Sequence, residues 1–278
     1  MNLTEACLAL EVSRSGYHDH LRKPCRKRRQ QDQALADVLS DEFALSRQTY
    51  GSPRLVAVLR QRGLRHGKNR VRRLMREHDL QVRQKRRFVP RTTQADKASH
   101  PSPNLLDAYP APTRPNQAWV TDITYLPTGE GWLYVAAEMD LYSRRIIGWD
   151  AGPSLATELT ASALQRALAT RRGHDLHALL HHSDRGCQYT SLAFRRQLAQ
   201  QGITQSMSRA GNCYDNAAIE SFWATLKTEC FGTTIPETRA EARTMLFDYI
   251  ETFYNPVRLH SSLNFLSPLD FEKSSQLN

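Results

Sequence analysis

Three apolar runs constrain the fold of this chain more than any other part of its sequence. They cover residues 119–126, 132–141 and 145–151, and the middle run is apolar at nearly every position, as in a central buried strand. Short turns at 129–131 and 142–143 separate the runs, which is the spacing of consecutive hairpins. This stretch therefore predicts three antiparallel strands.

Helical and strand-like patterns alternate after these runs. The sequence predicts strands at 179–183 and 203–207, and helices at about 155–169, at about 191–202 and from Pro236 onward. Antiparallel strands followed by helix–strand alternation indicate an α/β fold, with a mixed five-stranded sheet flanked by helices.

A further helix is predicted from Ala217, after a loop in which Asp215 or Asn216 can serve as the N-cap. Its apolar positions form one stripe that should face a core: Ile219, Phe222, Leu226 and Cys230. Glu220 and Lys227 lie two turns apart on a neighbouring stripe. A rigid helix would hold this carboxylate in a fixed position.

Two upstream acids are candidates for the same site as Glu220. Asp122 lies inside the first strand-like run, and Asp184 follows an apolar run at 178–180. The chain places 61 residues between the two aspartates and 35 between Asp184 and Glu220. Taken alone, each acid is more often a surface or capping residue. Together, three carboxylates can converge on Mg²⁺, and paired metal ions clamp an in-line phosphoryl transfer.

Four sequence motifs occur in a fixed order: WVTDITY, HSDRGCQYTS, SMSRAGNCYDNAAIESFWATLKTE and YNPVRLHSSLNFLSP. They resemble the retroviral-integrase-type core of bacterial insertion-sequence transposases. In particular, the chain is similar to the second reading frame of the large family with two overlapping frames. The resemblance spans roughly residues 13–268. It departs from the family pattern at Ala210, where a basic residue is usual, and at Cys187, where a small polar residue is common.

This resemblance implies a ribonuclease-H-like core and a Mg²⁺-dependent polynucleotidyl transferase. Such an enzyme cleaves DNA at insertion-sequence ends and transfers the 3′ end to a new phosphodiester. Asp122, Asp184 and Glu220 would be the catalytic residues and would hold two Mg²⁺ ions, with Mn²⁺ able to substitute. Lys227 would contact a DNA phosphate beside them.

The resemblance also implies the partners and the location. The partners would be transposon-end DNA, target DNA, further copies of this chain assembled on DNA, and a first-frame protein or a frameshifted fusion with it. The expected location is the bacterial cytoplasm, in association with the nucleoid. The sequence agrees, because it has no apolar run of about 18 residues and no basic segment ahead of its first apolar residues. Its five scattered cysteines favour reduced thiols.

The charge of the chain is confined to its N-terminal part. The net charge is +10, with +13 in residues 1–97 and −3 in residues 98–278. Five of the thirteen prolines lie between 101 and 115. We therefore predict a basic helical DNA-binding region at 1–97, a proline-rich linker at 98–115, and a catalytic core with a helical tail at 116–278.

Two parts of the basic region fit a helix-turn-helix. The first is a pair of short helices within 1–22, followed by a basic hinge at 23–30; the second, after a helix at 31–46, covers 52–78. An extended basic arm follows at 83–91. The predicted DNA contacts are the basic residues of the second candidate and the arm: Arg54, Lys68, Arg70, Arg72, Arg73, Arg76, Lys85, Arg86 and Arg87.

Two other classes of protein fit parts of this pattern. A non-catalytic DNA-binding regulator needs only the basic region, and metal-dependent nicking of DNA distinguishes it from an enzyme. A structure-specific nuclease of the same fold, such as a ribonuclease H or a junction resolvase, needs no long basic helical region. A strand-transfer assay separates that class from a transposase.

Several other polar or aromatic residues have simpler interpretations. Three histidines near one predicted strand lack a neighbouring cysteine pair, so a zinc site is disfavoured: His177, His181 and His182. Asp140 is expected to cap a turn, and Trp119 and Trp223 are expected to pack in the core. The chemical role of the polar tail from Tyr254 to Pro268 cannot be read from the sequence.

Overall fold

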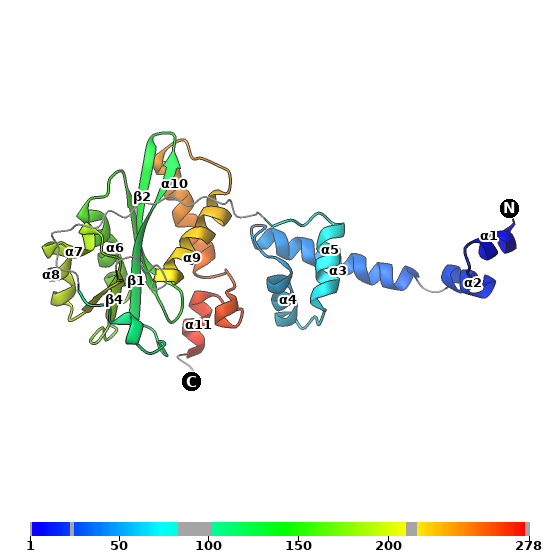
Figure 1. Cartoon of the computed structure of the whole chain (residues 1–278), viewed down its shortest axis with the longest axis horizontal. Helices are drawn as coiled ribbons and strands as arrows, with labels where there is room; N and C mark the ends of the chain where they lie inside the picture. The colour runs from blue at the N-terminus through cyan, green and yellow to red at the C-terminus, as the bar shows by residue number, and fades with distance from the viewer. Residues whose placement is uncertain (1, 23–24, 83–101, 210–215, 276–278) are drawn as a thin grey trace. The chain divides into compact units, whose positions relative to one another are not determined.

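The chain divides into two compact units, Met1–Val82 and Arg83–Asn278. Figure 1 colours the chain from blue at the N-terminus to red at the C-terminus. The computed structural model describes residues 2–22, 25–82, 102–209 and 216–275. The predicted basic arm at 83–91 lies outside these residues, and so do residues 98–101 of the predicted linker.

The described part of the N-terminal unit is helical throughout. Its helices are α1 (Leu3–Ala9), α2 (Arg14–Arg22), α3 (Cys25–Leu45), α4 (Ser52–Gln61) and α5 (Lys68–Glu77). The last three contribute fully buried side chains to one small core: Leu35, Leu39, Leu55, Leu59, Val71 and Leu74. The helix-turn-helix predicted at 52–78 is matched by α4 and α5, which together span Ser52–Glu77.

The hinge predicted at 23–30 is wrong from Cys25 onward, because these residues form the first turns of α3. Arginine, lysine and glutamine are good helix formers, so a basic run without glycine extends the helix instead of interrupting it. Gly51 is the N-cap of α4, and Pro53 occupies the first turn.

The C-terminal unit is built on one five-stranded sheet in the order β3-β2-β1-β4-β5. The strands are β1 (Ala118–Thr128), β2 (Gly131–Asp140), β3 (Ile146–Gly152), β4 (Leu180–Ser183) and β5 (Thr204–Met207). The first three pair antiparallel, whereas β4 pairs parallel with both β1 and β5. The predicted mixed sheet is confirmed, and its strand order is that of a ribonuclease-H-like fold.

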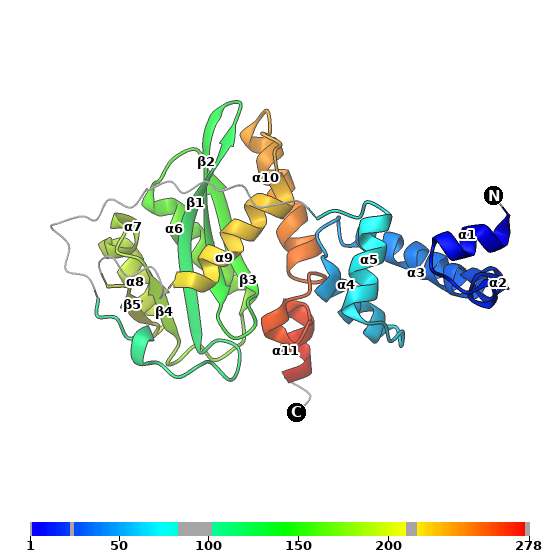
Figure 2. The same ribbon diagram turned by 45° about the vertical axis from the view of Figure 1, so that its right-hand side comes forward.

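Helices cover both faces of this sheet (Figure 2). One face carries α6 (Thr157–Thr170), α7 (Cys187–Thr190) and α8 (Leu192–Gln200), packed over a core that includes Trp119, Phe194 and Leu198. α6 approaches β3 so closely that a Cβ on Gly148 would lie 2.4 Å from the carbonyl oxygen of Ala163. Only glycine fits at this crossing.

The other face carries α9 (Ala217–Leu226) and α10 (Arg239–Phe247), which run on into π-helical turns at Lys227–Phe231 and Asp248–Tyr254. Three of the four residues of the predicted stripe are buried, Ile219, Phe222 and Leu226, whereas the fourth, Cys230, is half-buried in the π-helical turn. α10 and its π-helical turn add the buried side chains of Leu246, Ile250 and Phe253. The last helix predicted from Pro236 begins at Arg239 instead, because the Thr238 side chain accepts from the backbone N–H of Glu241 and caps it there. The chain continues to α11 (Pro268–Ser275).

The described part of the predicted linker covers the outer edge of β5. Met207 donates its backbone N–H to the carbonyl of Pro103 at 3.2 Å, and the Ser206 hydroxyl accepts from the backbone of Leu105 at 2.9 Å. Residues 102–109 thus satisfy part of an otherwise open sheet edge. Among the helices that the structure describes, none combines the length and the apolar character needed to cross a membrane.

Candidate active site

Asp122 and Asp184 are brought together by the pairing of β1 with β4. The parallel register aligns Val120 with His182, so Asp184, which follows β4, comes level with Asp122. On β1, the pairing with β4 covers Ala118–Val120 alone, so among the described residues no strand pairs with this edge of β1 from Asp122 onward. The two predicted aspartates therefore lie side by side at the point where the parallel pairing ends.

The electrostatics of the aspartates show that these carboxylates are close and poorly compensated. Burial and then the negative charge of Asp184 raise the pKa of Asp122 to about 7, with a smaller contribution from Glu220. Burial also raises the pKa of Asp184, although its side chain accepts a hydrogen bond from the backbone N–H of Gly186 at 2.9 Å. An arrangement of this kind favours a proton or a cation between the two groups.

Glu220 lies in the first turn of α9, where its side chain is largely exposed, and the partial burial of its carboxyl raises its pKa. Its negative charge also contributes to the raised pKa of Asp122, less than that of Asp184 does. Among the described residues, no three acidic, histidine or cysteine side chains lie close enough to form a finished set of metal ligands. The structure thus pairs the two aspartates and sets Glu220 beside them on a separate element.

The start of α9 is tied directly to β1. Asn216 is the N-cap residue of α9, one of the two predicted possibilities, but its side chain makes no cap hydrogen bond; its Nδ2 donates instead to the carbonyl of Thr121 at 3.2 Å. The other possibility, Asp215, lies outside the described residues. This hydrogen bond anchors the start of α9, the helix that carries Glu220, to Thr121, the residue before Asp122.

Trp223 is a site residue that sequence reasoning missed. The prediction that it packs in the core is confirmed, since it is 5% exposed, but its indole Nε1 also donates to Oδ2 of Asp122 at 3.1 Å. The spacing held a signal, because Trp223 lies one turn after Glu220 and so on nearly the same side of α9.

Lys227 follows α9 at the start of the π-helical turn, where its Nζ lies 5.2 Å from the centre of the Tyr125 ring. Burial lowers the pKa of this ammonium group, and the charge of Asp122 acts in the opposite direction. Lys227 therefore lies near Asp122, in agreement with the prediction that it lies beside the acids.

Buried polar groups lie on the sheet behind the acids. The Tyr189 hydroxyl is 3.3 Å from that of Thr121, and His181 pairs with Glu138 at 2.9 Å. The two ring nitrogens of His182 lie 2.9 Å from the Ser206 hydroxyl and 3.1 Å from the Ser208 hydroxyl. Both histidines are fully buried and take part in the hydrogen bonding of the core.

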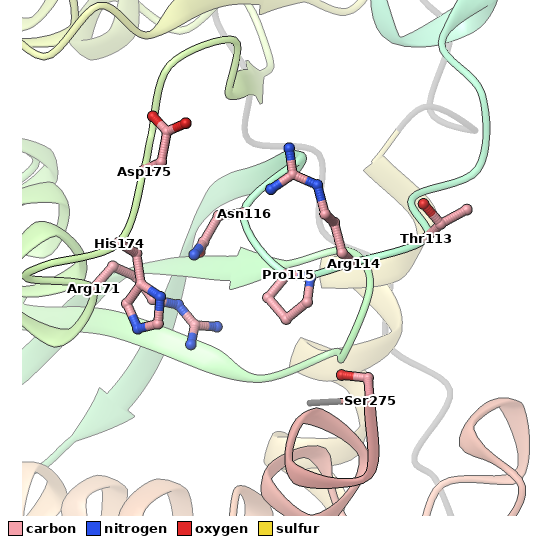
Figure 3. Close-up of a pocket in the computed structure, with 8 residues that line it drawn as sticks. All are labelled: Thr113, Arg114, Pro115, Asn116, Arg171, His174, Asp175 and Ser275. Carbon is pink, nitrogen blue, oxygen red and sulfur yellow. The ribbon is translucent and has the colours of Figure 1, made fainter. Parts of the chain in front are cut away.

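Asp140 caps a turn, as predicted, by accepting from the backbone N–H of Tyr142 at 2.9 Å. It also belongs to a buried ionic cluster. Arg171 contacts both Asp140 and Glu272 of α11, and Arg145 donates to Glu272 at 2.9 Å. A pocket lies against this cluster at the start of β1 and holds none of the three predicted catalytic acids (Figure 3); its lining residues are Thr113, Arg114, Pro115, Asn116, Arg171, His174, Asp175 and Ser275.

The structure gives the polar tail a mechanical role. Arg258 forms two hydrogen bonds of 2.6 Å with Glu229, in the π-helical turn that follows α9. Tyr249 donates its hydroxyl to the same carboxylate at 2.8 Å, and the Arg258 guanidinium lies over the ring of Tyr254. The tail motif therefore holds the end of the helix that carries Glu220 and Trp223.

The predicted DNA-contacting residues differ in how the structure places them. Three are exposed on α5: Lys68, Arg72 and Arg76. Arg70 and Arg73 reach across to α3 and share the carboxylate of Asp32, with nitrogen–oxygen distances of 2.6 Å each. Arg54 lies over the Tyr50 ring. The remaining three, in the basic arm, lie outside the described residues: Lys85, Arg86 and Arg87.

A helical unit with a basic outer helix, followed by a ribonuclease-H-like sheet with paired aspartates, defines the class of integrase-type DNA-processing proteins. Family comparison gives the same class. Residues 30–88 match an HTH-like domain, and residues 112–213 and 201–268 match two profiles described as Integrase core domain.

Whole-chain relatives are insertion-sequence proteins. The chain is 42% identical to an insertion element IS600 31 kDa protein of Shigella sonnei, covering 98% of this chain and 99% of the relative. It is 39% identical to the transposase InsF for insertion sequence IS3A of Escherichia coli, covering 97% and 93%. It is 38% identical to a transposase for IS904 of Lactococcus lactis, covering 91% and 98%. The chain belongs to the IS3-type family of insertion-sequence transposases, as a second-reading-frame protein.

More distant likenesses are to retroviral proteins. A simian T-cell lymphotropic virus intasome in complex with a PP2A regulatory subunit aligns with a TM-score of 0.49 at 16% identity, over 80% of this chain and 72% of that chain. The catalytic core domain of HTLV-2 integrase in complex with magnesium aligns with a TM-score of 0.40 at 16% identity, over 58% and 98%.

Proposed function

We propose that this transposase cleaves DNA at the ends of its insertion sequence and joins the freed 3′ end to a new phosphodiester. The observation that carries the proposal is the pairing of Asp122 with Asp184, with Glu220 acting on the same charge. Repulsion among carboxylates in a partly dry site is costly unless a cation is bound there. The similarity of the chain to transposases supports DNA cleavage and strand transfer as the reaction at this site.

The donor set fits Mg²⁺, and also Mn²⁺, because it consists of carboxylate oxygens without sulfur or imidazole. Asp122, Asp184 and Glu220 would hold the ions. When bound, two such ions supply activation of the attacking hydroxyl or water and stabilisation of the leaving oxygen.

The chain's own groups keep the acids oriented. Trp223 donates to Oδ2 of Asp122, and the backbone N–H of Ile123 also donates to this carboxylate, which fixes its orientation. The backbone N–H of Gly186 does the same for Asp184. Lys227 supplies a positive charge beside Asp122, suited to a DNA phosphate that enters along the free edge of β1.

We assign DNA gripping to residues 1–97 and catalysis to residues 116–278, with the linker at 98–115 between them. The excess charge of +13 in the first region supports this division, because phosphate contacts supply most of the affinity for DNA. Transposon-end and target DNA are the proposed partners, together with further copies of this chain and a first-frame protein or fusion.

The decisive experiment compares Glu220→Gln with Glu158→Gln in the full chain. Both glutamates are exposed in the first turn of a helix of the same unit, α9 and α6. Nicking and strand transfer are measured on DNA that carries the element's ends, with and without Mg²⁺. We expect Glu220→Gln to lose nearly all of both activities while keeping its DNA affinity, and Glu158→Gln to retain them.

Equal activity of the two variants would reject the site. Nicking without strand transfer would favour a nuclease, and DNA binding without nicking by the parent protein would favour a regulator.

A further inference from the structure

The hairpin of β1 and β2 continues past the acids and carries an exposed aromatic pair. Trp132 is 47% exposed, whereas the other three tryptophans of the chain are 0%, 5% and 6% exposed. The ring of Trp132 meets that of Tyr125 edge to face, with centroids 4.9 Å apart and planes at 89°. Tyr125 thus supports an indole whose own surface faces solvent.

The backbone under Trp132 is firmly held. Arg239 donates to the carbonyl of Trp132 at 3.1 Å and to that of Glu130 at 2.7 Å, and Gly129 donates to the carbonyl of Pro236 at 2.9 Å. A Cβ on Gly129 would lie 2.5 Å from the carbonyl oxygen of Glu237, so the contact between hairpin and loop is too close for a side chain. An exposed ring on a fixed backbone loses little conformational entropy when a flat ligand stacks on it.

The aromatic pair adjoins the candidate active site. Tyr125 lies three residues after Asp122 on the part of β1 that β4 does not cover. Tyr125 also contacts Lys227, whose Nζ lies 5.2 Å from the centre of the Tyr125 ring. Lys227, from the turn after α9, therefore lies near both the acid Asp122 and the Tyr125 ring that supports the exposed indole.

We propose that Trp132, supported by Tyr125, is a stacking platform for an unpaired nucleobase of the DNA strand beside the scissile phosphate. Lys227 holds the backbone of that strand. The proposal rests on the proposed function. A flat π-surface next to a cation suits a nucleotide, whose base stacks and whose phosphate is negative, better than it suits an apolar protein segment. Stacking tolerates any base, so the platform does not require a particular sequence.

The test uses the full chain in EDTA and two DNA duplexes of equal length, one with blunt ends and one with three unpaired nucleotides at an end. Binding is measured by fluorescence anisotropy, and iodide quenching of tryptophan fluorescence reports on Trp132, the exposed indole. The variants are Trp132→Ala, Trp132→Phe and, as a control, Phe247→Ala, which removes another exposed aromatic side chain of the same unit.

We expect the parent protein to prefer the unpaired end by about fivefold or more, the value of one stacked base. Trp132→Ala should lose this preference, Trp132→Phe should keep most of it, and Phe247→Ala should leave it intact. The unpaired end should also shield Trp132 from iodide, and the blunt end should not.

A preference that survives in Trp132→Ala, an indole that stays open to iodide at saturating DNA, or equal shielding by both duplexes would overturn the proposal. None of these measurements requires cleavage. A chain that never nicks DNA but shows the Trp132-dependent preference would reject the proposed function alone.

Discussion

The indole Nε1 of Trp223 donates to Oδ2 of Asp122 at 3.1 Å, which links α9 to the acid on the neighbouring strand. The helix that carries Glu220 therefore also orients the first aspartate of the site. The position of Glu220 and the orientation of Asp122, which lies on β1, therefore both depend on where α9 lies.

Trp223→Phe keeps the apolar ring and removes the donor to Asp122. A hydrogen bond to a charged group is worth about 1.5–3 kcal/mol, so the pKa of Asp122 should rise by about one unit or more. The activity profile in Mg²⁺ should shift to higher pH. The control is Trp149→Phe, which removes an equivalent indole bond of 2.8 Å to Glu251 away from the acids. Identical pH profiles for the two variants would contradict the orienting role.

The raised pKa of Asp122 predicts how the metal-free protein responds to pH. Its folded-state pKa of about 7 lies above the ordinary value of 3.8, so its contribution to stability is complete below about pH 4 and is lost as the pH rises through 7. Asp122→Asn should therefore be as stable as the parent near pH 4 and more stable at pH 8, by roughly 2–4 kcal/mol. Thermal melts in EDTA measure this difference.

Asp150 provides the control of opposite sign. Burial would raise the pKa of this carboxyl, but hydrogen bonds from Ser162, Ala151 and Arg243 outweigh burial and lower it. Its contribution to stability is therefore present above pH 4 and lost in acid. Asp150→Asn should be less stable than the parent at pH 7 and should approach it at pH 3. Parallel pH profiles for the two variants would refute the assignment for Asp122.

Asp32→Asn should raise the affinity for duplex DNA while it lowers the stability of the N-terminal unit. The change releases Arg70 and Arg73 from their shared carboxylate and removes a negative charge near the predicted DNA-binding face. Binding is measured by anisotropy over a range of salt concentrations. The matched control is Asp37→Asn, another aspartate on α3, whose side chain accepts from Gln33. If both variants gain equally, the two arginines add nothing beyond net charge.

Arg258→Met should cost about 3–5 kcal/mol of unfolding free energy, because it leaves the carboxylate of Glu229 buried without its cation. Adding Glu229→Gln should recover part of that loss. Arg243→Met, which breaks a more exposed pair with Asp150, should cost about 1 kcal/mol or less. Urea denaturation of the three variants decides the matter, and similar losses for both single substitutions would argue against a buried clamp.

The strands and the positions of the three acids could be predicted because they depend on local patterns. An apolar run fixes β1 around Asp122, and the periodicity of α9 fixes the side on which Glu220 lies. The bond from Trp223 to Asp122 could not be predicted in this way. A tryptophan satisfies an apolar stripe whether or not its N–H finds a partner, and the partner here is 101 residues away in sequence.

The same limit applies to charges. The basic residues of α5 were identified from the sequence, but the pairing of Arg70 and Arg73 with Asp32 depends on how α3 and α5 cross. Likewise, nothing in the spacing of the tail reveals that Arg258 reaches Glu229. Sequence periodicity gives the side of an element on which a charge lies, and tertiary packing decides what that charge contacts.

The cluster of Asp140, Arg171 and Glu272 has a consequence for how the protein is made. Synthesis runs from the N-terminus, so the sheet and α6 leave the ribosome well before Glu272, which contacts both Arg171 and Arg145. Until α11 emerges, Arg171 has Asp140 but not Glu272, and Arg145 lacks its ion pair with Glu272, so the ionic cluster is incomplete. The C-terminal unit of a nascent chain therefore reaches its full stability only after α11 has been translated.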